Sequence, residues 1–487
     1  MSTKIYTLPT SWFRGRVRGL RLISPEVQGR PSVDFRPIGL NGQHSPSARP
    51  RAFPTPTASS RRSDAAHPRI LSTNGSHESR SAGKIHCRVE ADHFSGIVSY
   101  LDSLEQEIQQ WRRGSLMRSL RYEPELLDFS SNDYLCLNRD GSHSELLNSL
   151  ICETGVESNV TVGSTGSRLI RGHWPSFENA EEEFNRWART PDSLLFQSGY
   201  NANVGALSAL TGPGDLVFCD RLCHASLLDG IRLSGAQKIY FKHNDLNHLE
   251  SLLATKSTRR RKWILSESVF SMDGDVPDLK GLLDLCRRYQ ATLYLDEAHA
   301  LGFFGSEESP GAGLLASRRA ELGDDVFDHA IISAPLGKAP GVMGAFVAGD
   351  KLLKDYLINR ARSFVFSTAQ PPILAAMIGA IIRRFRNHEY DHRMASLRKN
   401  VSYIKSLIAE LHLVSPSDSA IVPIVLGETD KCLQVSEHLK NHGMDVRAIR
   451  PPTVPEGSSR LRITIHSCHS QSELDRLMEL IQPFASV

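Results

Sequence analysis

The chain has 487 residues, which exceeds the usual size of one domain, so two cooperating domains with extensions are expected. Its 57 Lys and Arg residues nearly balance 54 Asp and Glu residues, and a net charge of +3 gives no ground for nucleic-acid binding. No apolar stretch approaches the roughly 20 residues of a membrane span, so no membrane association is expected. Eight cysteines without a Cys-x-x-Cys pair are typical of a protein that needs no disulfides.

Residues 1–90 are rich in Arg, Ser and Pro, and their first acid is Glu26. Arginines that alternate with apolar residues, as in a mitochondrial presequence, are Arg14, Arg16, Arg18 and Arg21. We therefore expect a mitochondrial location, with the cytoplasm or the peroxisome as alternatives. The same stretch is also compatible with a disordered tail or a mis-set start site.

Residues 91–125 should form a helical arm, because apolar residues recur there at helical spacing. These residues are Ile97, Tyr100, Leu101, Leu104 and Ile108. Alternating strand-like and helix-like segments predict a large domain over 126–372 and a smaller α/β domain over 373–487.

Two polar motifs in the large domain follow strand-like runs. Ser198-Gly-Tyr-Asn-Ala-Asn203 precedes a predicted helix over 204–210, and helix N-termini with free amides bind phosphate. His224 precedes a predicted helix over 225–233. Taken alone, both motifs are more often helix caps than binding sites.

The motif Leu293-Tyr-Leu-Asp-Glu-Ala-His299 should place Asp296 at the carboxyl end of a buried strand, where ligands of α/β sheets bind. A buried carboxylate needs a cationic partner such as a protonated pyridine nitrogen. Asp-Glu-Ala-His also occurs in helicases, but Gly337-Lys338 is followed by Ala339 rather than Ser or Thr, and no phosphate-binding loop precedes the acid.

Lys338 lies between apolar residues and glycines. Burial disfavours a charged amine, and Schiff-base chemistry needs the neutral form, so Lys338 is a candidate covalent catalyst. Later in the chain, Arg462 follows a proline-rich loop on a strand-like run, and an arginine fork suits a carboxylate. His466, Cys468 and His469 lie close together but lack further ligands at zinc spacing, so no metal site is expected.

From about Leu127 to the C-terminus these motifs, in this order, resemble the α-oxoamine synthases, which are pyridoxal-phosphate enzymes of aminotransferase fold type I. The resemblance also includes Ser130-Ser-Asn-Asp-Tyr-Leu135 and Ser268-Val-Phe-Ser-Met-Asp-Gly-Asp275. It implies an α/β fold, with a large mixed-sheet domain covered by helices on both faces and a smaller C-terminal α/β domain. Pyridoxal 5'-phosphate is the implied cofactor.

The resemblance also implies a role for each candidate residue. Lys338 would bind the cofactor covalently and move protons, with His224 stacking on the ring and assisting catalysis. Asp296 would pair with the ring nitrogen, and Ser271 and His299 would touch the phenolic oxygen. Gly199 and Tyr200 would hold the phosphate through their amides. Ser367 and Thr368 would reach the phosphate of the neighbouring subunit, which implies a homodimer.

The wording around Ile449-Arg-Pro-Pro-Thr-Val-Pro455 is most similar to the branch that makes 8-amino-7-oxononanoate in biotin biosynthesis. This branch joins L-alanine to a pimeloyl thioester of coenzyme A or a carrier protein through a quinonoid of the cofactor, with loss of carbon dioxide. Arg462 and Asn132 would then bind the amino acid, with Arg450 and Thr453 near the acyl chain. Two alternatives are a related synthase for another amino acid and acyl thioester, and a catalytically weak partner subunit.

Several positions depart from the family pattern. The family usually has a threonine hydroxyl on the phosphate three residues before the lysine, where this chain has Pro335. Phe177 stands where the family usually has a histidine, and Ser306-Glu-Glu-Ser-Pro310 adds residues to the glycine-rich loop after His299. Weak cofactor retention or an altered acyl substrate is therefore expected.

Overall fold

The computed structural model describes residues 99–114, 117, 120, 122–153, 162–413 and 415–485. The chain divides into two units, Met1–Glu107 and Ile108–Val487. Helix α1 (Tyr100–Arg113) lies within the range predicted as a helical arm, and the arm itself stays a prediction. The arginine-rich segment over 1–90 lies outside the described residues. Within the described part of the chain, no helix combines the length and the apolar character needed to cross a membrane.

The second unit is built around a seven-stranded sheet with the order β2-β8-β7-β6-β5-β3-β4. Strand β8 is antiparallel to both of its neighbours, and the remaining neighbours are parallel. The strands are β2 (Asp192–Phe196), β3 (Leu216–Asp220), β4 (Gln237–Phe241), β5 (Lys262–Glu267), β6 (Ala291–Asp296), β7 (Ala330–Pro335) and β8 (Ala345–Gly349). The mixed sheet agrees with the predicted fold class.

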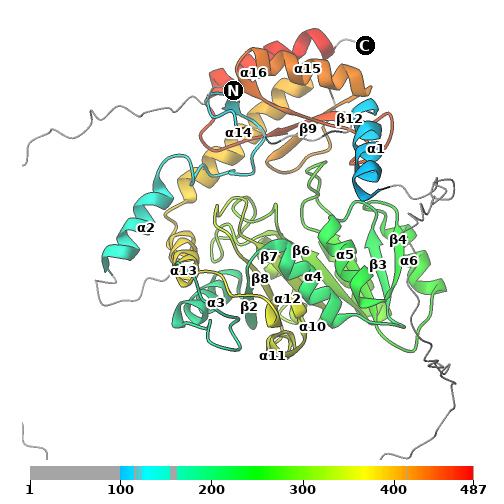
Figure 1. Ribbon diagram of the computed structural model, residues 1–487, viewed down its shortest axis with the longest axis vertical. Helices are drawn as coiled ribbons and strands as arrows, with labels where there is room; N and C mark the ends of the chain where they lie inside the picture. The colour runs from blue at the N-terminus through cyan, green and yellow to red at the C-terminus, as the bar shows by residue number, and fades with distance from the viewer. Residues whose placement is uncertain are drawn as a thin grey trace, which may run out of the picture. The chain divides into compact units, whose positions relative to one another are not determined.

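Helices cover both faces of this sheet, as alternate residues of β6 show. Leu293 and Leu295 belong to one buried apolar cluster, whereas Tyr294 between them belongs to another. Figure 1 shows α4 and α5 packed side by side against the sheet. The helices of this part are α2 (Ser142–Glu153), α3 (Pro175–Ala188), α4 (Gly199–Leu210), α5 (Ala225–Ser234), α6 (Leu246–Thr255), α7 (Leu279–Tyr289), α8 (Leu314–Ser317), α9 (Arg319–Leu322), α10 (Val326–His329), α11 (Lys351–Arg360) and α12 (Arg362–Val365).

Helix α4 begins five residues before the predicted helix over 204–210. The reason is a cap, because the Ser198 hydroxyl accepts a hydrogen bond from the Asn201 amide and so ends the preceding extended segment. The register of the parallel strands then aligns their carboxyl ends. Glu267 of β5 pairs with Asp296 of β6, and Asp296 pairs with Ser333 of β7. Asp296, which was predicted to face a ligand, therefore lies beside Glu267 at one edge of the sheet.

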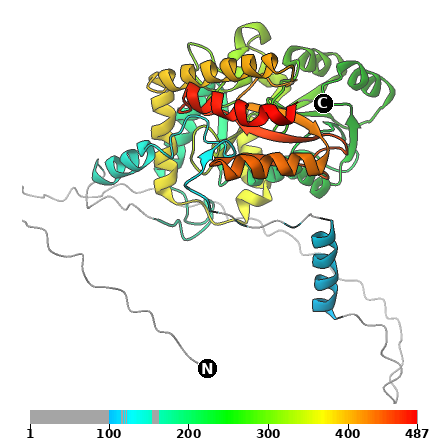
Figure 2. The same ribbon diagram turned by 90° about the horizontal axis from the view of Figure 1, so that it is seen from above.

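The C-terminal part contains a smaller antiparallel sheet with the order β11-β12-β9. Its strands are β9 (Ile421–Gly427), β11 (Arg447–Ile449) and β12 (Ser459–Thr464), and its helices are α13 (Pro372–Arg386), α14 (Asp391–Glu410), α15 (Thr429–Asn441) and α16 (Gln471–Ala485). Figure 2 shows the orange and red helices beside these strands. The boundary predicted at residue 372 coincides with the start of α13, and the division into two domains there stays a prediction.

Residues 127–136 are tied to this C-terminal part. Strand β1 (Leu127–Asp128) pairs in parallel with β10 (Met444–Asp445). A disulfide joins Cys136 to Cys468, whose Cα atoms are 6.3 Å apart. The expectation that the chain has no disulfide is therefore wrong at this pair. The two cysteines are 332 residues apart in sequence, so only the tertiary structure brings them together.

Candidate active site

A cavity of about 220 Å³ opens at the carboxyl ends of the central strands. It collects residues from several of the predicted motifs. The residues that line the cavity include Gly199, Tyr200, Asn203, His224, Glu267, Asp296, His299, Pro335 and Lys338. The fold thus unites the acidic motif, the lysine loop, the start of α4 and the start of α5 in one site.

Lys338 lies in the loop between β7 and β8, and its Nζ is 3.4 Å from His299 Nε2. Burial lowers the pKa of the Lys338 amine; Asp296 opposes the shift, and Arg462 adds to it. Burial also holds the pKa of His299 well below its usual value, with the Lys338 charge adding to the effect. His299 is therefore neutral near pH 7. Because burial lowers the pKa of Lys338, forming its neutral amine costs less free energy than in an exposed lysine.

Asp296 ends β6 and is 5 % exposed. Its carboxylate accepts hydrogen bonds from Asn203 Nδ2 at 2.7 Å and from the Ala298 amide at 2.9 Å. Burial raises the pKa of Asp296, and the Asn203 hydrogen bond opposes that shift. Both hydrogen-bond donors are neutral, so the buried carboxylate is suited to a cationic partner from a ligand, such as a protonated ring nitrogen.

Asn203 ends the Ser198–Asn203 motif, but the sequence does not indicate its role. In the structure its Nδ2 also donates to Ser226 Oγ at 2.9 Å, and its Oδ1 accepts from the Tyr294 hydroxyl at 3.1 Å. Asn203 lies one helical turn after Gly199, which is the only sequence signal that it faces the same ligand. Its three hydrogen bonds hold the orientation of Asp296.

His224 is the N-cap residue of α5, which agrees with its interpretation as a helix cap. It also lines the cavity. Its Nδ1 lies 2.8 Å from Ser226 Oγ, and its backbone amide donates to Glu267 Oε1 at 2.5 Å. Burial raises the pKa of Glu267 well above its usual value, and the nearby Asp296 raises it further. Glu267 is a second residue that the sequence did not single out. Glu267 ends an apolar strand, as Asp296 does, and this position in the sequence could have indicated that it lies at the site.

The N-terminus of α4 contributes Gly199 and Tyr200 to the cavity wall. A Cβ at Gly199 would lie 2.7 Å from Cγ of Pro335, so no side chain fits there. The proline that replaces the family threonine therefore packs directly on the candidate phosphate-binding turn. The Tyr200 hydroxyl points elsewhere and donates to Asp229 at 2.8 Å, which leaves the amides of this turn as the groups that could hold a phosphate.

Arg462 lies on β12 and is 8 % exposed. Its guanidinium donates to Asn132 Oδ1 at 2.9 Å, to the Ser271 carbonyl at 2.7 Å and to Thr464 Oγ1 at 3.1 Å. All three acceptors are neutral, so the positive charge has no carboxylate partner among the described residues within 4.0 Å. Ser271 thus contributes its carbonyl oxygen here, and its predicted hydroxyl contact with the cofactor stays a prediction.

Tyr134 links Arg462 to the lysine. Its hydroxyl oxygen is 2.6 Å from His299 Nδ1 and 3.2 Å from Asn132 Oδ1. A continuous series of polar contacts therefore runs from Lys338 through His299, Tyr134 and Asn132 to Arg462. Tyr134 belongs to a motif of the family resemblance, but the sequence does not indicate its role, because its partner His299 is 165 residues away.

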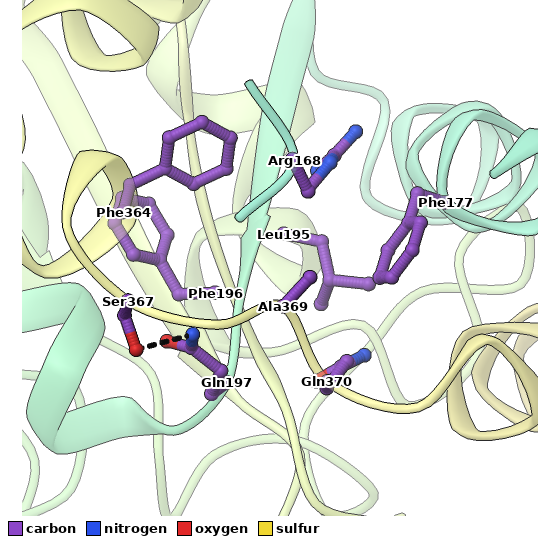
Figure 3. Close-up of a pocket in the computed structure, with 9 residues that line it drawn as sticks. All are labelled: Arg168, Phe177, Leu195, Phe196, Gln197, Phe364, Ser367, Ala369 and Gln370. Carbon is purple, nitrogen blue, oxygen red and sulfur yellow. Dashed lines mark hydrogen bonds between the residues drawn. The ribbon is translucent and has the colours of Figure 1, made fainter. Parts of the chain in front are cut away.

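The remaining predicted residues lie outside the cavity lining. Arg450 and Thr453 lie between β11 and β12, and a hydrogen bond of 3.0 Å from the Thr453 amide to the Arg450 carbonyl closes a turn in the proline-rich loop. Gln197 Nε2 donates to Ser367 Oγ at 2.9 Å and to the Thr368 carbonyl at 2.6 Å. Gln197 and Ser367 line a small crevice (Figure 3).

Phe177, the second departure from the family, lines that crevice. Its ring lies 4.7 Å from Cζ of Arg168, and Phe364 faces the same guanidinium from the other side at 5.4 Å, as Figure 3 shows. Arg168 also pairs with buried Glu181 at 2.5 Å. Phe177 is therefore part of the packing around a buried ion pair, where a cation–π contact replaces whatever hydrogen bond a histidine would make.

Comparison with known proteins agrees with this geometry. Residues 124–481 match the family model described as aminotransferase class I and II. The chain is 40 % identical over 366 residues to a putative 8-amino-7-oxononanoate synthase of Geobacillus kaustophilus, covering 73 % of this chain and 88 % of the relative. It is 41 % identical over 355 residues to the 8-amino-7-oxononanoate synthase of Chromobacterium violaceum, with the same two coverages.

Solved structures show the same fold. An 8-amino-7-oxononanoate synthase from Francisella tularensis superposes with a TM-score of 0.60 at 27 % identity, covering 74 % of this chain and 97 % of that one. A serine palmitoyltransferase from Sphingomonas wittichii gives a TM-score of 0.71 at 23 % identity, covering 80 % and 98 %. The latter similarity concerns the fold alone.

The predicted mitochondrial location is wrong. The similar curated proteins come from bacteria, which have no mitochondria, and they are named as enzymes of the same type. The arginine-rich segment that suggested a presequence lies outside the described residues, and the family match begins only at residue 124. A basic, Ser-rich composition alone is therefore insufficient to assign a compartment.

The lysine, the buried acid and the imidazoles in one cavity provide the groups that pyridoxal phosphate requires, and the matches extend over most of the chain. The chain belongs to the class I and II aminotransferase family, as a pyridoxal-phosphate-dependent acyltransferase of the α-oxoamine synthase type.

Proposed function

We propose that the protein condenses L-alanine with a pimeloyl thioester to give 8-amino-7-oxononanoate. In this reaction the α-carbon of alanine forms a bond to the acyl carbon. The thiol of the carrier leaves, and the amino-acid carboxylate departs as carbon dioxide. The carrier would be coenzyme A or a carrier protein. The names of the relatives support this substrate pair.

The observation that carries the proposal is the connection between Arg462 and Lys338. Arg462 is a buried cation with neutral acceptors only, which suits the carboxylate of an amino acid. The contacts through Asn132, Tyr134 and His299 hold the Arg462 guanidinium at a fixed position relative to the amine of Lys338. Asn132 thereby acts as a positioning residue for the amino-acid site.

Pyridoxal phosphate supplies an electron-poor ring that delocalises negative charge from the substrate α-carbon. Lys338 would hold it covalently, and Asp296 would keep its ring nitrogen protonated. His224 would stack on the ring, and His299 with Ser271 would contact the phenolic oxygen. Gly199 and Tyr200 would hold the phosphate through their amides, without the threonine donor that Pro335 replaces.

Lys338 is the residue that we expect to move the proton of the α-carbon. Burial lowers the pKa of its amine, so the neutral form is more accessible than for an exposed lysine. His224 would lie beside the reacting carbon and assist this transfer. General acid–base catalysis of this kind typically contributes about 10²- to 10⁴-fold in rate.

The acyl chain and the assembly are less directly supported. We propose that Arg450 and Thr453 lie near the acyl chain, in the turn that precedes β12. We also propose a homodimer in which Ser367 and Thr368 reach the phosphate of the neighbouring subunit. In one chain they contact Gln197, directly before the Ser198 cap of the phosphate-binding helix, which is compatible with that role.

The test is a turnover assay that crosses alanine, glycine and serine with acyl thioesters of several lengths, using Lys338→Ala protein as the inactive control. We expect the highest kcat/KM with alanine and the pimeloyl thioester. Turnover only with fatty-acyl thioesters would refute the assignment to the biotin pathway while leaving the enzyme family unchanged. Turnover with no pair would favour the weak partner subunit.

A further inference from the structure

The disulfide between Cys136 and Cys468 lies next to the amino-acid side of the site. Cys136 is 1 % exposed, whereas Cys468 is exposed in the turn that follows β12. Cys136 also has a left-handed backbone with a φ of 58°, a conformation that favours glycine over residues with a side chain. The backbone conformation at residue 136 therefore favours glycine over the cysteine that is present there.

We propose that Cys136 and Cys468 form a reversible thiol–disulfide site that sets the affinity of the enzyme for its amino-acid substrate. The inference rests on the proposed function only in taking Arg462 as the carboxylate-binding residue. The disulfide form is the high-affinity form, and the dithiol form binds the amino acid more weakly.

The two cysteines belong to the two segments that build the amino-acid site. Cys136 follows Tyr134 by two residues, and Tyr134 contacts both His299 and Asn132. Cys468 follows Arg462 by six residues, in the segment that leaves β12. The disulfide therefore joins the segment that carries Asn132 to the segment that carries Arg462, and these two side chains are hydrogen bonded to each other.

Backbone hydrogen bonds between the two segments stop near the disulfide. The Thr464 amide donates to the Phe129 carbonyl at 2.8 Å, and the Ser467 amide donates to the Tyr134 carbonyl at 2.8 Å. The covalent link one residue after Ser467 then closes this contact at its exposed end. Because the pair spans 332 residues, opening it removes the only covalent restraint between the segments in the described chain.

His466 provides the site with a neutral hydrogen-bond acceptor, because burial lowers the pKa of its ring to about 3. One of its ring nitrogens lies within 4.8 Å of both sulfurs. Its Nε2 donates to the Ser131 carbonyl at 3.1 Å, so the neutral ring carries its lone pair on Nδ1. That Nδ1 is buried and has no hydrogen-bond partner in the disulfide form. A thiol of the dithiol form could donate the hydrogen bond that this lone pair lacks in the disulfide form.

The chemistry balances with a small-molecule disulfide such as oxidised glutathione as the oxidant. The thiolate of exposed Cys468 attacks one sulfur of the oxidant and releases one small thiol. The thiolate of Cys136 then attacks the mixed disulfide at the Cys468 sulfur and releases the second small thiol. Two electrons pass to the oxidant, and the two protons of the protein thiols pass through water to the two small thiols that are released.

The experiment equilibrates the purified holoenzyme in glutathione buffers from reducing to oxidising. Alkylation of free thiols and mass spectrometry give the oxidised fraction of Cys136 and Cys468, and this readout does not depend on activity. Titration with L-alanine, glycine or L-serine, followed through the visible absorption band of the bound cofactor, gives amino-acid affinity. We expect affinity to fall about fivefold or more on reduction, in parallel with loss of the disulfide.

Variants make the test specific. Cys136→Ser and Cys468→Ser should each have the weaker affinity under all buffers, whereas Cys152→Ser should respond as the wild type does, because Cys152 is an exposed free cysteine on α2.

Three results would overturn the proposal. These are free thiols at both positions in oxidising buffer, a bound metal ion retained by the two thiols in place of the disulfide, and an amino-acid affinity that is equal in the two mapped redox forms. Failure of the proposed function looks different. If alanine is not the substrate, the ratio of affinities in the two forms is still obtained with glycine or serine.

Discussion

Replacement of Pro335 by threonine tests whether this chain lacks a phosphate donor that its relatives have. Pro335 ends β7, lines the cavity and packs on Gly199, so a hydroxyl at this position would face the start of α4. A hydrogen bond to a charged group contributes about 1.5–3 kcal/mol, and each 1.4 kcal/mol is about tenfold in affinity. We therefore expect Pro335→Thr to bind pyridoxal phosphate about 10- to 100-fold more tightly.

The matched control is Pro335→Val, which has nearly the shape of threonine but no hydroxyl. Both variants remove the proline ring from Gly199 to the same extent, so the difference between them reports the hydroxyl alone. The assay is equilibrium binding of the cofactor to apoprotein, followed by absorbance, with thermal unfolding as a check on folding. Equal cofactor affinities of two folded variants would refute the reasoning and mean that residue 335 does not reach the phosphate.

Three further predictions concern the site and its support. Lys338→Ala should abolish covalent attachment of the cofactor, so borohydride treatment should label the wild type at this residue and leave the variant unlabelled; label at another residue would contradict the assignment. Asn203→Ala removes the hydrogen bond that opposes the rise in the pKa of Asp296, and we expect about 5- to 100-fold lower kcat with a pH profile displaced upward on its acidic limb. An unchanged profile would show that Asp296 does not need this donor. His243 bridges Asp220 and Asp275 at 2.9 and 2.8 Å; burial would lower the pKa of His243, but the two acids outweigh it and raise the pKa to about 10. The stability that this bridge contributes is fully present below the usual histidine pKa of about 6.5 and is lost as the pH rises through about 10, so urea unfolding of wild type and His243→Asn should differ most at low pH and converge at high pH. A difference that grows with pH would contradict this sign.

The positions of the candidate residues relative to the predicted strands made the core of the site predictable. An acid directly after an apolar strand, as at Asp296, can only lie at the carboxyl edge of a parallel sheet, and the lysine loop follows the next strand. Parallel strand ends meet at one edge, so Asp296, His299 and Lys338 had to be near one another. The roles of these residues still came from the family resemblance, because many chemistries use the same edge.

The sequence alone therefore indicated an α/β fold and the edge of the sheet that holds the candidate site, because periodicity and motif order are local properties of the chain. The resemblance to the family supplied the mixed sheet and the cofactor class. Only the tertiary structure decided that Tyr134 contacts His299, that Asn203 holds Asp296, and that Cys136 joins Cys468. Each of these pairs spans 93 or more residues, and a side chain carries no local signal of a partner that far away. The packing of the sheet and the position of β12 beside residues 127–136 supply that information.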